Sequence, residues 1–467
     1  MSSARFDVFA IGARMSPTRL MSEELSWWSD EQEQVLGLVF RDRADDDYGW
    51  ILMARDKLGR FRCVDLDASL RSASYAQSGL RQRIGRAVEE GDIEALGDQA
   101  EETNFATDLL AVPVGTNDDD LHPHFQELLR SPAREPARRV FREIGPWLTP
   151  SDPHFVNEFQ FTQFDQRLWE LYLWAALREM GYDIKQPEAP DFLCVTPGVK
   201  FTMEATTCAP STSGVLADHP NPETPEEIAE FLAHYMPMKF GSSLTSKLSK
   251  KNKNGESYWE RGETAGKPFV LAIADFHISG GNGQAGSMTY TQSALWPYLY
   301  GHRVSWEKID GQLIARATRG EPHTFGGKTI ETGFFDLEGT ENISAVLFSN
   351  AGTLAKFDRI GVSAGFASDD HVYLRFGHRL DPSPDAVLPE FFSERIDVES
   401  GETWADELQL FHNPKAKLPL PSHAFPGVTH HFFEDGVQRS YSMGRPVLGS
   451  RTMIIGARQT DTEAEVV

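Results

Sequence analysis

The stretch APDFLCVTPGVKFTMEATT, residues 189–207, decides the fold of the region around it. Two apolar runs flank the turn signal TPG at 196–198, so the stretch predicts a β-hairpin. Side chains alternate along a strand, so one face of the second strand carries four polar residues: Lys200, Thr202, Glu204 and Thr206. Asp191 heads the first strand and lies near Glu204 if the hairpin register allows. Two explanations are open: an ordinary polar sheet face, or two carboxylates that hold a divalent cation.

The segments on either side of the hairpin predict helices and buried strands. FDQRLWELYLWAALREMGYDI, 164–184, has apolar residues at helical spacing and places Glu170 in its most apolar stretch. A second helix is expected from the capping-box pattern TPEE at 224–227. GKPFVLAIADF, 266–276, and NISAVLFSN, 342–350, both have the composition of buried strands.

The rest of the chain is divided by composition. We expect a small β-rich N-terminal domain over 1–112, with strands at 35–42, 49–56 and 60–67. A linker with a short helix is expected over 113–153, a central core over 154–380, and an irregular, proline-rich C-terminal accessory region with a tail over 381–467.

Composition limits the class of protein. The 467 residues carry 45 basic and 69 acidic side chains, a net charge of −24, which disfavours general binding to polyanions. The three cysteines, Cys63, Cys194 and Cys208, form no CxxC pair, so neither a disulfide framework nor a cysteine-rich zinc site is expected. No run approaches the roughly 18 apolar residues of a membrane span, and the start lacks a signal-peptide core. A soluble cytoplasmic protein is expected.

Converging carboxylates predict a metal site. Two carboxylates that approach one another repel, and a cation between them keeps both ionised at neutral pH. Magnesium fits, because it prefers oxygen ligands and binds through one or two carboxylates plus substrate phosphate. Such an ion polarises a phosphodiester and acidifies a water molecule.

The pattern Pro190-Asp191, twelve residues, then Glu204-Ala205-Thr206 resembles the PD-(D/E)XK nuclease superfamily. The resemblance covers about 160 to 280 and implies an α/β fold with a restriction-endonuclease-like core, a mixed sheet flanked by helices. It implies a Mg²⁺- or Mn²⁺-dependent endonuclease, a phosphodiester hydrolase. Asp191, Glu204 and the carbonyl of Ala205 would bind the metal, and Glu170 would bind a second ion or a metal-bound water.

The sequence departs from the family pattern at one position. The superfamily lysine should stand at 206, where this chain has Thr206, which donates a hydrogen bond but carries no charge. Lys200 lies on the correct face but roughly 20 Å from that position along an extended strand. A lysine from the following helix, such as Lys247, could take its place. The alternatives are therefore a relocated lysine or a catalytically inactive nuclease-fold binding module.

A local excess of lysine follows the hairpin. Residues 231–254 contain no Asp or Glu and carry five lysines: Lys239, Lys247, Lys250, Lys251 and Lys253. These side chains either contact nucleic-acid phosphates or form an ordinary solvated helix face. The expected partner is a nucleic acid, DNA rather than RNA, with a homodimer as an option and no membrane.

Other candidate ligands have a simpler explanation. The run Asp45, Asp46 and Asp47 and the pair His122 and His124 are expected in solvated loops. The C-terminal histidines match no zinc pattern: His412, His423, His430 and His431.

Overall fold

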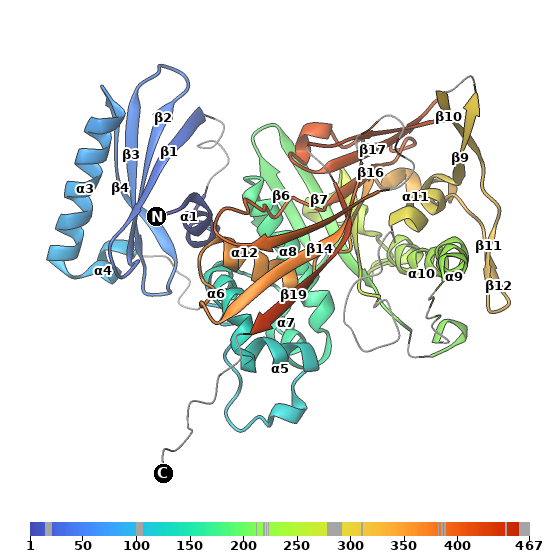
Figure 1. The fold of residues 1–467 in the computed structure, drawn as a ribbon, viewed down its shortest axis with the longest axis horizontal. Helices are drawn as coiled ribbons and strands as arrows, with labels where there is room; N and C mark the ends of the chain where they lie inside the picture. Colours follow the sequence, from blue (N-terminus) through green and yellow to red (C-terminus); the bar gives the residue numbers. More distant parts are fainter. Residues whose placement is uncertain are drawn as a thin grey trace, which may run out of the picture.

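The protein has a mixed α/β architecture with one large mixed sheet flanked by helices and a small antiparallel N-terminal sheet (Figure 1). The computed structural model describes residues 1–14, 21–99, 106–211, 213–217, 220, 222, 224–277, 292–309, 312–381, 383, 386, 389–443 and 446–456. Among the helices in these ranges, none has the length and apolar character needed to cross a membrane.

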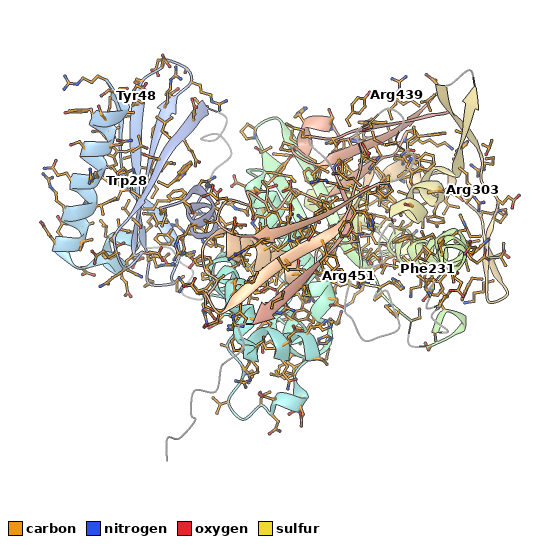
Figure 2. The ribbon with its side chains drawn as sticks, in the orientation of Figure 1. Trp28, Tyr48, Phe231, Arg303, Arg439 and Arg451 are labelled. Atoms are coloured by element: carbon orange, nitrogen blue, oxygen red, sulfur yellow. The ribbon has the colours of Figure 1, made fainter. Side chains whose placement is uncertain are left out.

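The N-terminal sheet is a four-stranded antiparallel meander with α3 (Ala73–Glu90) on one face. Its strands in order are β1 (Ser22–Ser29), β2 (Val35–Asp42), β3 (Tyr48–Arg55) and β4 (Phe61–Leu70). Leu80 and Ile84 of α3 pack on the sheet, and Trp28 and Tyr48, labelled in Figure 2, border this contact. The expected strands are confirmed. β1 was not expected, because SEELSWWS is a half-buried edge strand with few β-branched residues.

The opposite face of this sheet packs on the main core. Leu36, Met53 and Phe61 join the same buried cluster as Phe141. α1 (Ser3–Phe9) lies in this contact, and α4 (Ile93–Gly97) follows α3.

The central sheet has eight strands in the order β18-β17-β16-β13-β8-β7-β6-β5. Their bounds are β5 (Asp183–Lys185), β6 (Phe192–Thr196), β7 (Val199–Cys208), β8 (Phe269–Asp275), β13 (Ala345–Ser349), β16 (Gln409–His412), β17 (Thr429–Glu434) and β18 (Val437–Tyr441). The expected hairpin is the antiparallel pair β6–β7, and β7, β8 and β13 run parallel. Because β8 and β13 are covered on both faces, every residue in them is buried.

Helices cover both faces of this sheet, and alternation along the strands assigns the faces. Met203 and Ala205 of β7 face the core that contains α6 (Glu135–Ile144), α8 (Phe164–Glu179) and α12 (Leu354–Ser363). Leu271 and Ile273 of β8 face the core that contains α10 (Met236–Ser249) and α11 (Gln292–Tyr300). α9 (Pro225–Glu230) begins at the expected capping box and leads into α10 through a π-helical turn.

The C-terminal region differs from the expectation of an irregular accessory segment. It supplies β16, β17 and β18 to the central sheet. A separate three-stranded sheet in the order β15-β14-β19 comprises β14 (His371–Arg379), β15 (Glu390–Ile396) and β19 (Val447–Gly456). Of the prolines that suggested irregular structure, Pro389, Pro414, Pro419, Pro421 and Pro426 lie in connections between strands, where a missing N–H disrupts no ladder. Pro382 and Pro384 lie outside the described residues.

The expected segment boundaries do not divide the buried core. One cluster of buried residues runs from Phe6 to Val428 and includes residues of all four expected segments. The expected linker holds α5 (Pro123–Arg130) and α6, whose Phe125 and Phe141 are fully buried.

Short elements complete the fold. Two small hairpins are β9 (His302–Ile309) with β10 (Gln312–Arg319), and β11 (His323–Phe325) with β12 (Lys328–Ile330). The short helical segments are α7 (Phe155–Asn157), the π-helical η4 (Glu158–Thr162) and η6 (Phe231–Tyr235), and the 3₁₀ turns η1 (Asp118–Asp120), η2 (Pro132–Arg134), η3 (Gly145–Trp147), η5 (Val215–Ala217), η7 (Tyr258–Glu260), η8 (Gly262–Thr264), η9 (Phe334–Asp336), η10 (Thr340–Asn342) and η11 (Ser422–Ala424).

Candidate active site

The hairpin register brings Asp191 and Glu204 together. Phe192 pairs with Met203, so Asp191, one residue before β6, lies opposite Glu204. Asp191 is hydrogen-bonded to Glu204 and to its neighbour Ala205. The Asp191 N–H donates to Oε2 of Glu204 at 3.3 Å, and Oδ2 of Asp191 accepts from the N–H of Ala205 at 2.7 Å. These contacts fix both carboxylates at one edge of the hairpin.

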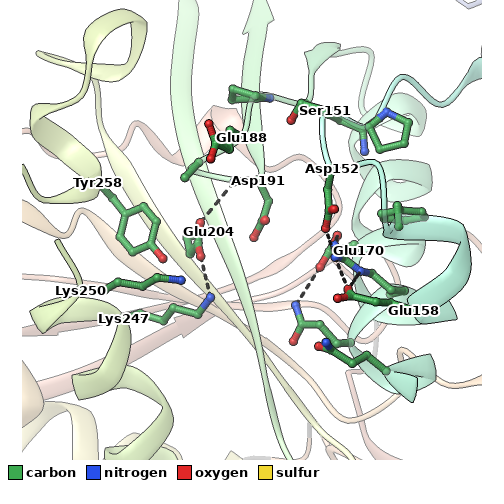
Figure 3. A pocket seen from close by; sticks show the side chains of 18 residues that line it. Ser151, Asp152, Glu158, Glu170, Glu188, Asp191, Glu204, Lys247, Lys250 and Tyr258 are labelled. Carbon is green, nitrogen blue, oxygen red and sulfur yellow. Dashed lines mark hydrogen bonds and ion pairs between the residues drawn. The ribbon is translucent and has the colours of Figure 1, made fainter. Parts of the chain in front are cut away.

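A lysine from the helix after the hairpin contacts this pair. Lys247, in the last turn of α10, places Nζ 2.6 Å from Oε1 of Glu204. The Glu204 side chain is 5% exposed and that of Lys247 is 20% exposed, so water screens this ion pair only weakly. Figure 3 shows the contact at the wall of a cavity. Lys247 thus brings a positive charge to Glu204 from outside the strand.

Glu170 approaches the hairpin from α8 on the opposite side of the cavity (Figure 3). It is only 5% exposed and accepts two hydrogen bonds of 2.9 Å from its own helix, from Gln166 and Arg167. Nε2 of Gln166 also lies 3.5 Å from the carbonyl oxygen of Ala205, and Oε1 of Gln166 accepts from the Thr207 hydroxyl at 3.3 Å. Gln166 therefore connects Glu170 to β7.

The carboxylates are poorly compensated by positive charge. Burial, together with the neighbouring Glu204 and Glu170, raises the pKa of Asp191 well above its ordinary value, although Lys247 and the Ala205 N–H oppose this shift. Burial also raises the pKa of Glu170, with Glu204 adding to the shift against the opposing effect of Arg167. Relative to the unfolded chain, the fold therefore shifts both groups toward their protonated forms.

The cavity has a volume of about 340 Å³ and acidic walls. Its acidic residues are Asp152, Glu158, Glu170, Glu188, Asp191 and Glu204, and its basic residues are Arg167, Lys247 and Lys250. Arg167 forms ion pairs with Asp152, Glu158 and Glu170. The positive charge of Arg167 is therefore mostly compensated by these carboxylates on the α8 side of the cavity, away from Asp191.

Tyr258, Gln166 and Arg167 line the cavity but were not expected from the sequence. Burial and the nearby carboxylates of Glu204 and Asp191 raise the pKa of Tyr258, so its hydroxyl stays protonated as a potential donor. Gln166 and Arg167 precede Glu170 by four and three residues, so helical spacing could have identified them. Tyr258 lies in a loop turn whose sequence carries no signal of its position.

Several expected site residues lie elsewhere. Among the described residues that line the cavity, neither Lys200 nor Thr206 occurs. Lys200 is exposed, about 13 Å along β7 from Glu204, and Thr206 is buried where β7 passes beneath α10. Neither position can replace the contact that Lys247 makes.

The five lysines do not form one surface. Lys239 is buried and donates to the hydroxyl of Ser211 at 2.6 Å, so it differs from the expectation of a phosphate contact. Helical rotation explains this, because Lys239 occupies the core-facing side of α10. Lys250, Lys251 and Lys253 are exposed after the helix ends, and Lys250 lines the cavity.

The other candidate ligands have local partners. Asp42, Asp45 and Asp47 group their carboxylates at the β2–β3 turn, where two of the three are half-buried. His124 lies 3.3 Å from Asp165, and His412 lies 2.9 Å from His430. Within the described ranges, these histidines belong to no group of three metal-ligating side chains.

Comparison of the chain with family models, curated proteins and solved structures found no match.

Proposed function

We propose that the protein is a metal-dependent nuclease that hydrolyses phosphodiester bonds, with DNA as its substrate and a restriction-endonuclease-like core. The observation that carries this proposal is the position of Asp191 and Glu204 at the wall of an acidic cavity, where Glu204 accepts from the Asp191 N–H and the Asp191 carboxylate accepts from the N–H of the neighbouring Ala205. Gln166 connects two further oxygen ligands, because its side-chain amide donates both to Glu170 and to the Ala205 carbonyl. This donor set consists of oxygen atoms only, which suits Mg²⁺ or Mn²⁺.

The cavity residues fit a divalent cation electrostatically. Asp191 and Glu170 have raised pKa values because burial and mutual repulsion outweigh the nearby cations. Asp191, Glu204 and the Ala205 carbonyl would hold the first ion, and Glu170 would hold a second ion or its water. A bound cation supplies Lewis acidity toward the phosphodiester and acidifies water at neutral pH.

Lys247 takes the part of the missing motif lysine. Its ammonium already lies 2.6 Å from Glu204, so it places positive charge beside a proposed metal ligand without requiring a lysine at 206. There it stabilises negative charge that develops on a phosphate during hydrolysis. Tyr258, whose hydroxyl stays protonated, adds a neutral donor on the same wall.

Nucleic-acid binding rests on a smaller lysine group than the sequence suggested. Lys250 borders the cavity, and Lys251 and Lys253 are exposed beside it. Each phosphate contact releases condensed counterions, so binding through this group should weaken steeply with salt. With a net charge of −24, contact with DNA requires a local basic surface such as this one.

A plasmid-cleavage assay with Mg²⁺ or Mn²⁺ tests the proposal. Asp191→Asn and Glu204→Gln should each lower the cleavage rate at least about 100-fold, because metal-ion catalysis contributes several kcal/mol. Glu143→Gln is the matched control, because Glu143 is also a buried carboxylate but pairs with Arg55 outside the cavity. Undiminished cleavage in both cavity variants would rule out the assignment.

A catalytically inactive binding module is the second candidate. The buried Thr206 and the engagement of Lys247 with Glu204 favour it, since no lysine extends from β7 into the cavity. This candidate predicts salt-dependent DNA binding that Lys250→Met weakens, with no cleavage under any divalent cation. Cleavage that depends on Asp191 excludes it.

A further inference from the structure

A second group of metal-ligating side chains lies at the ends of β7 and β8. Cys208 ends β7 and pairs in register with Asp275, which ends β8, and His277 follows two residues later. The three are buried, with exposures of 1%, 1% and 0%. One ligand atom from each lies within 4.8 Å of the other two. Parallel pairing of β7 with β8 therefore brings a sulfur, an oxygen and a nitrogen donor together.

The contacts within this group leave one oxygen without a protein partner. Oδ1 of Asp275 accepts from the His277 N–H at 3.0 Å and lies 2.7 Å from Nδ1 of the same residue. Sγ of Cys208 lies 4.0 Å from that Nδ1. Oδ2 of Asp275 is buried and has no hydrogen-bond partner among the described residues. Such an orphaned acceptor costs about 1–3 kcal/mol, more when charged, so the site has capacity for a ligand.

The geometry does not suit a nucleophilic cysteine. In a Cys-His-Asp arrangement, the thiol and the carboxylate contact opposite nitrogens of the imidazole, which passes the proton between them. Here Sγ of Cys208 and Oδ1 of Asp275 both approach Nδ1 of His277.

We propose that Cys208, Asp275 and His277 form a binding site for Zn²⁺ or a similar borderline transition metal. Thiolate and imidazole donors select such ions, whereas the all-oxygen cavity around Asp191 selects Mg²⁺ or Mn²⁺. Binding replaces the Cys208 S–H bond with a sulfur–metal bond and releases the proton to solvent, with no change in oxidation state.

The surroundings are compatible with an added cation. Lys239 is the charged residue near both Cys208 and Asp275, and its ammonium donates to Ser211 at 2.6 Å. Neither Lys239 nor Ser211 is a proposed ligand. The site is about 13 Å along β7 from Glu204, so the two ion sites share a strand face but no ligand.

Cobalt substitution tests the proposal through the sulfur ligand. The variant Cys63→Ser/Cys194→Ala keeps Cys208 as the sole thiol of a chain that has three cysteines. Titrated with Co²⁺ after chelator treatment, it should develop a thiolate-to-cobalt charge-transfer band that saturates at one ion per chain. One equivalent of Zn²⁺ should abolish the band. Absence of the band would overturn the proposal. This outcome does not depend on whether variants at Cys208 fold, because the titrated protein keeps Cys208.

Two further variants in that background assign the ligands. Cys208→Ser and Asp275→Asn should lose the band, and Zn²⁺ should no longer raise their melting temperature. Glu204→Gln should keep the full band. The metal site at Cys208 and the nuclease function can therefore each be disproved without affecting the other. A band that persists in Cys208→Ser would contradict the assignment.

Discussion

Two buried charge clusters in this protein use the same side-chain types with opposite electrostatic results. Where α12 supplies two of the cations, two carboxylates meet three cations: Glu402, Glu407, Lys356, Arg359 and Arg375. Lys356 lies 2.6 Å from Glu402, and all five side chains are less than 8% exposed. In the cavity, Glu170, Asp191 and Glu204 share two close cations, Arg167 and Lys247.

The pKa values separate the two clusters. Burial alone would raise the pKa of Glu402, but Arg359, Lys356 and Arg375 outweigh burial and lower it. The pKa of Glu407 is lowered for the same reason. For Asp191, burial and the neighbouring carboxylates dominate, and its pKa is raised. A cluster with excess cations is complete within the protein, whereas a cluster with excess carboxylates has capacity for a cation from solution.

The largest expected effect is the loss of a cation from the complete cluster. Lys356→Met should lower the free energy of unfolding by about 3–5 kcal/mol, because it leaves buried carboxylates uncompensated. Glu390→Gln is the control, since the Arg379–Glu390 pair, with side chains 30% and 38% exposed, should contribute at most about 1 kcal/mol. Urea denaturation measures both. An equal loss of unfolding free energy in Lys356→Met and Glu390→Gln would mean that burial does not strengthen the ion pairs of Lys356.

A smaller effect is expected when a cation is removed from the cavity. Lys247→Met should cost about 1.5–3 kcal/mol, the contribution of a hydrogen bond to a charged group. Added Mn²⁺ should recover most of this loss, because a divalent ion compensates Glu204 in place of the ammonium. The same Mn²⁺ should not rescue Lys356→Met. If Mn²⁺ does not restore the unfolding free energy of Lys247→Met, the Lys247 ammonium is the sole cation that Glu204 requires.

The smallest effect is an opposite dependence on pH. Asp191 has a folded pKa above its unfolded value, so between the two values the folded state binds more protons, and stability falls as pH rises. Asp191→Asn should therefore flatten this loss in metal-free urea titrations. For Glu402 and Glu407 the folded pKa lies below the unfolded value, so their contribution is present above the unfolded value and is lost as pH falls through the folded one. A loss of stability with rising pH that is unchanged in Asp191→Asn would contradict this account.

The elements that carry the proposed ligands were largely predictable from the sequence. Two apolar runs around the turn signal TPG identified β6 and β7, and helical spacing identified α8 with Glu170. The hairpin register follows from the two-residue turn and places Asp191 opposite Glu204. Local pattern was sufficient here because these contacts are close in sequence.

Contacts between distant segments were not predictable. The sequence suggested Lys247 as a replacement for the motif lysine, but its contact with Glu204 depends on α10 crossing β7. The pattern of five lysines did not reveal that Lys239 faces the core. The pairing of Cys208 with Asp275 depends on the parallel β7–β8 register, which no local signal encodes. The C-terminal strands were missed because they are short and separated by proline-rich loops.

Direct measurement of Mn²⁺ binding to the metal-free protein tests the central claim, that Asp191 and Glu204 form an incompletely compensated pair that holds a divalent cation. Isothermal titration should give saturable binding in the wild type and in Glu143→Gln. Asp191→Asn and Glu204→Gln should each lose this binding. Wild-type protein that binds no Mn²⁺, or cavity variants that bind it as tightly as the wild type, would contradict the claim.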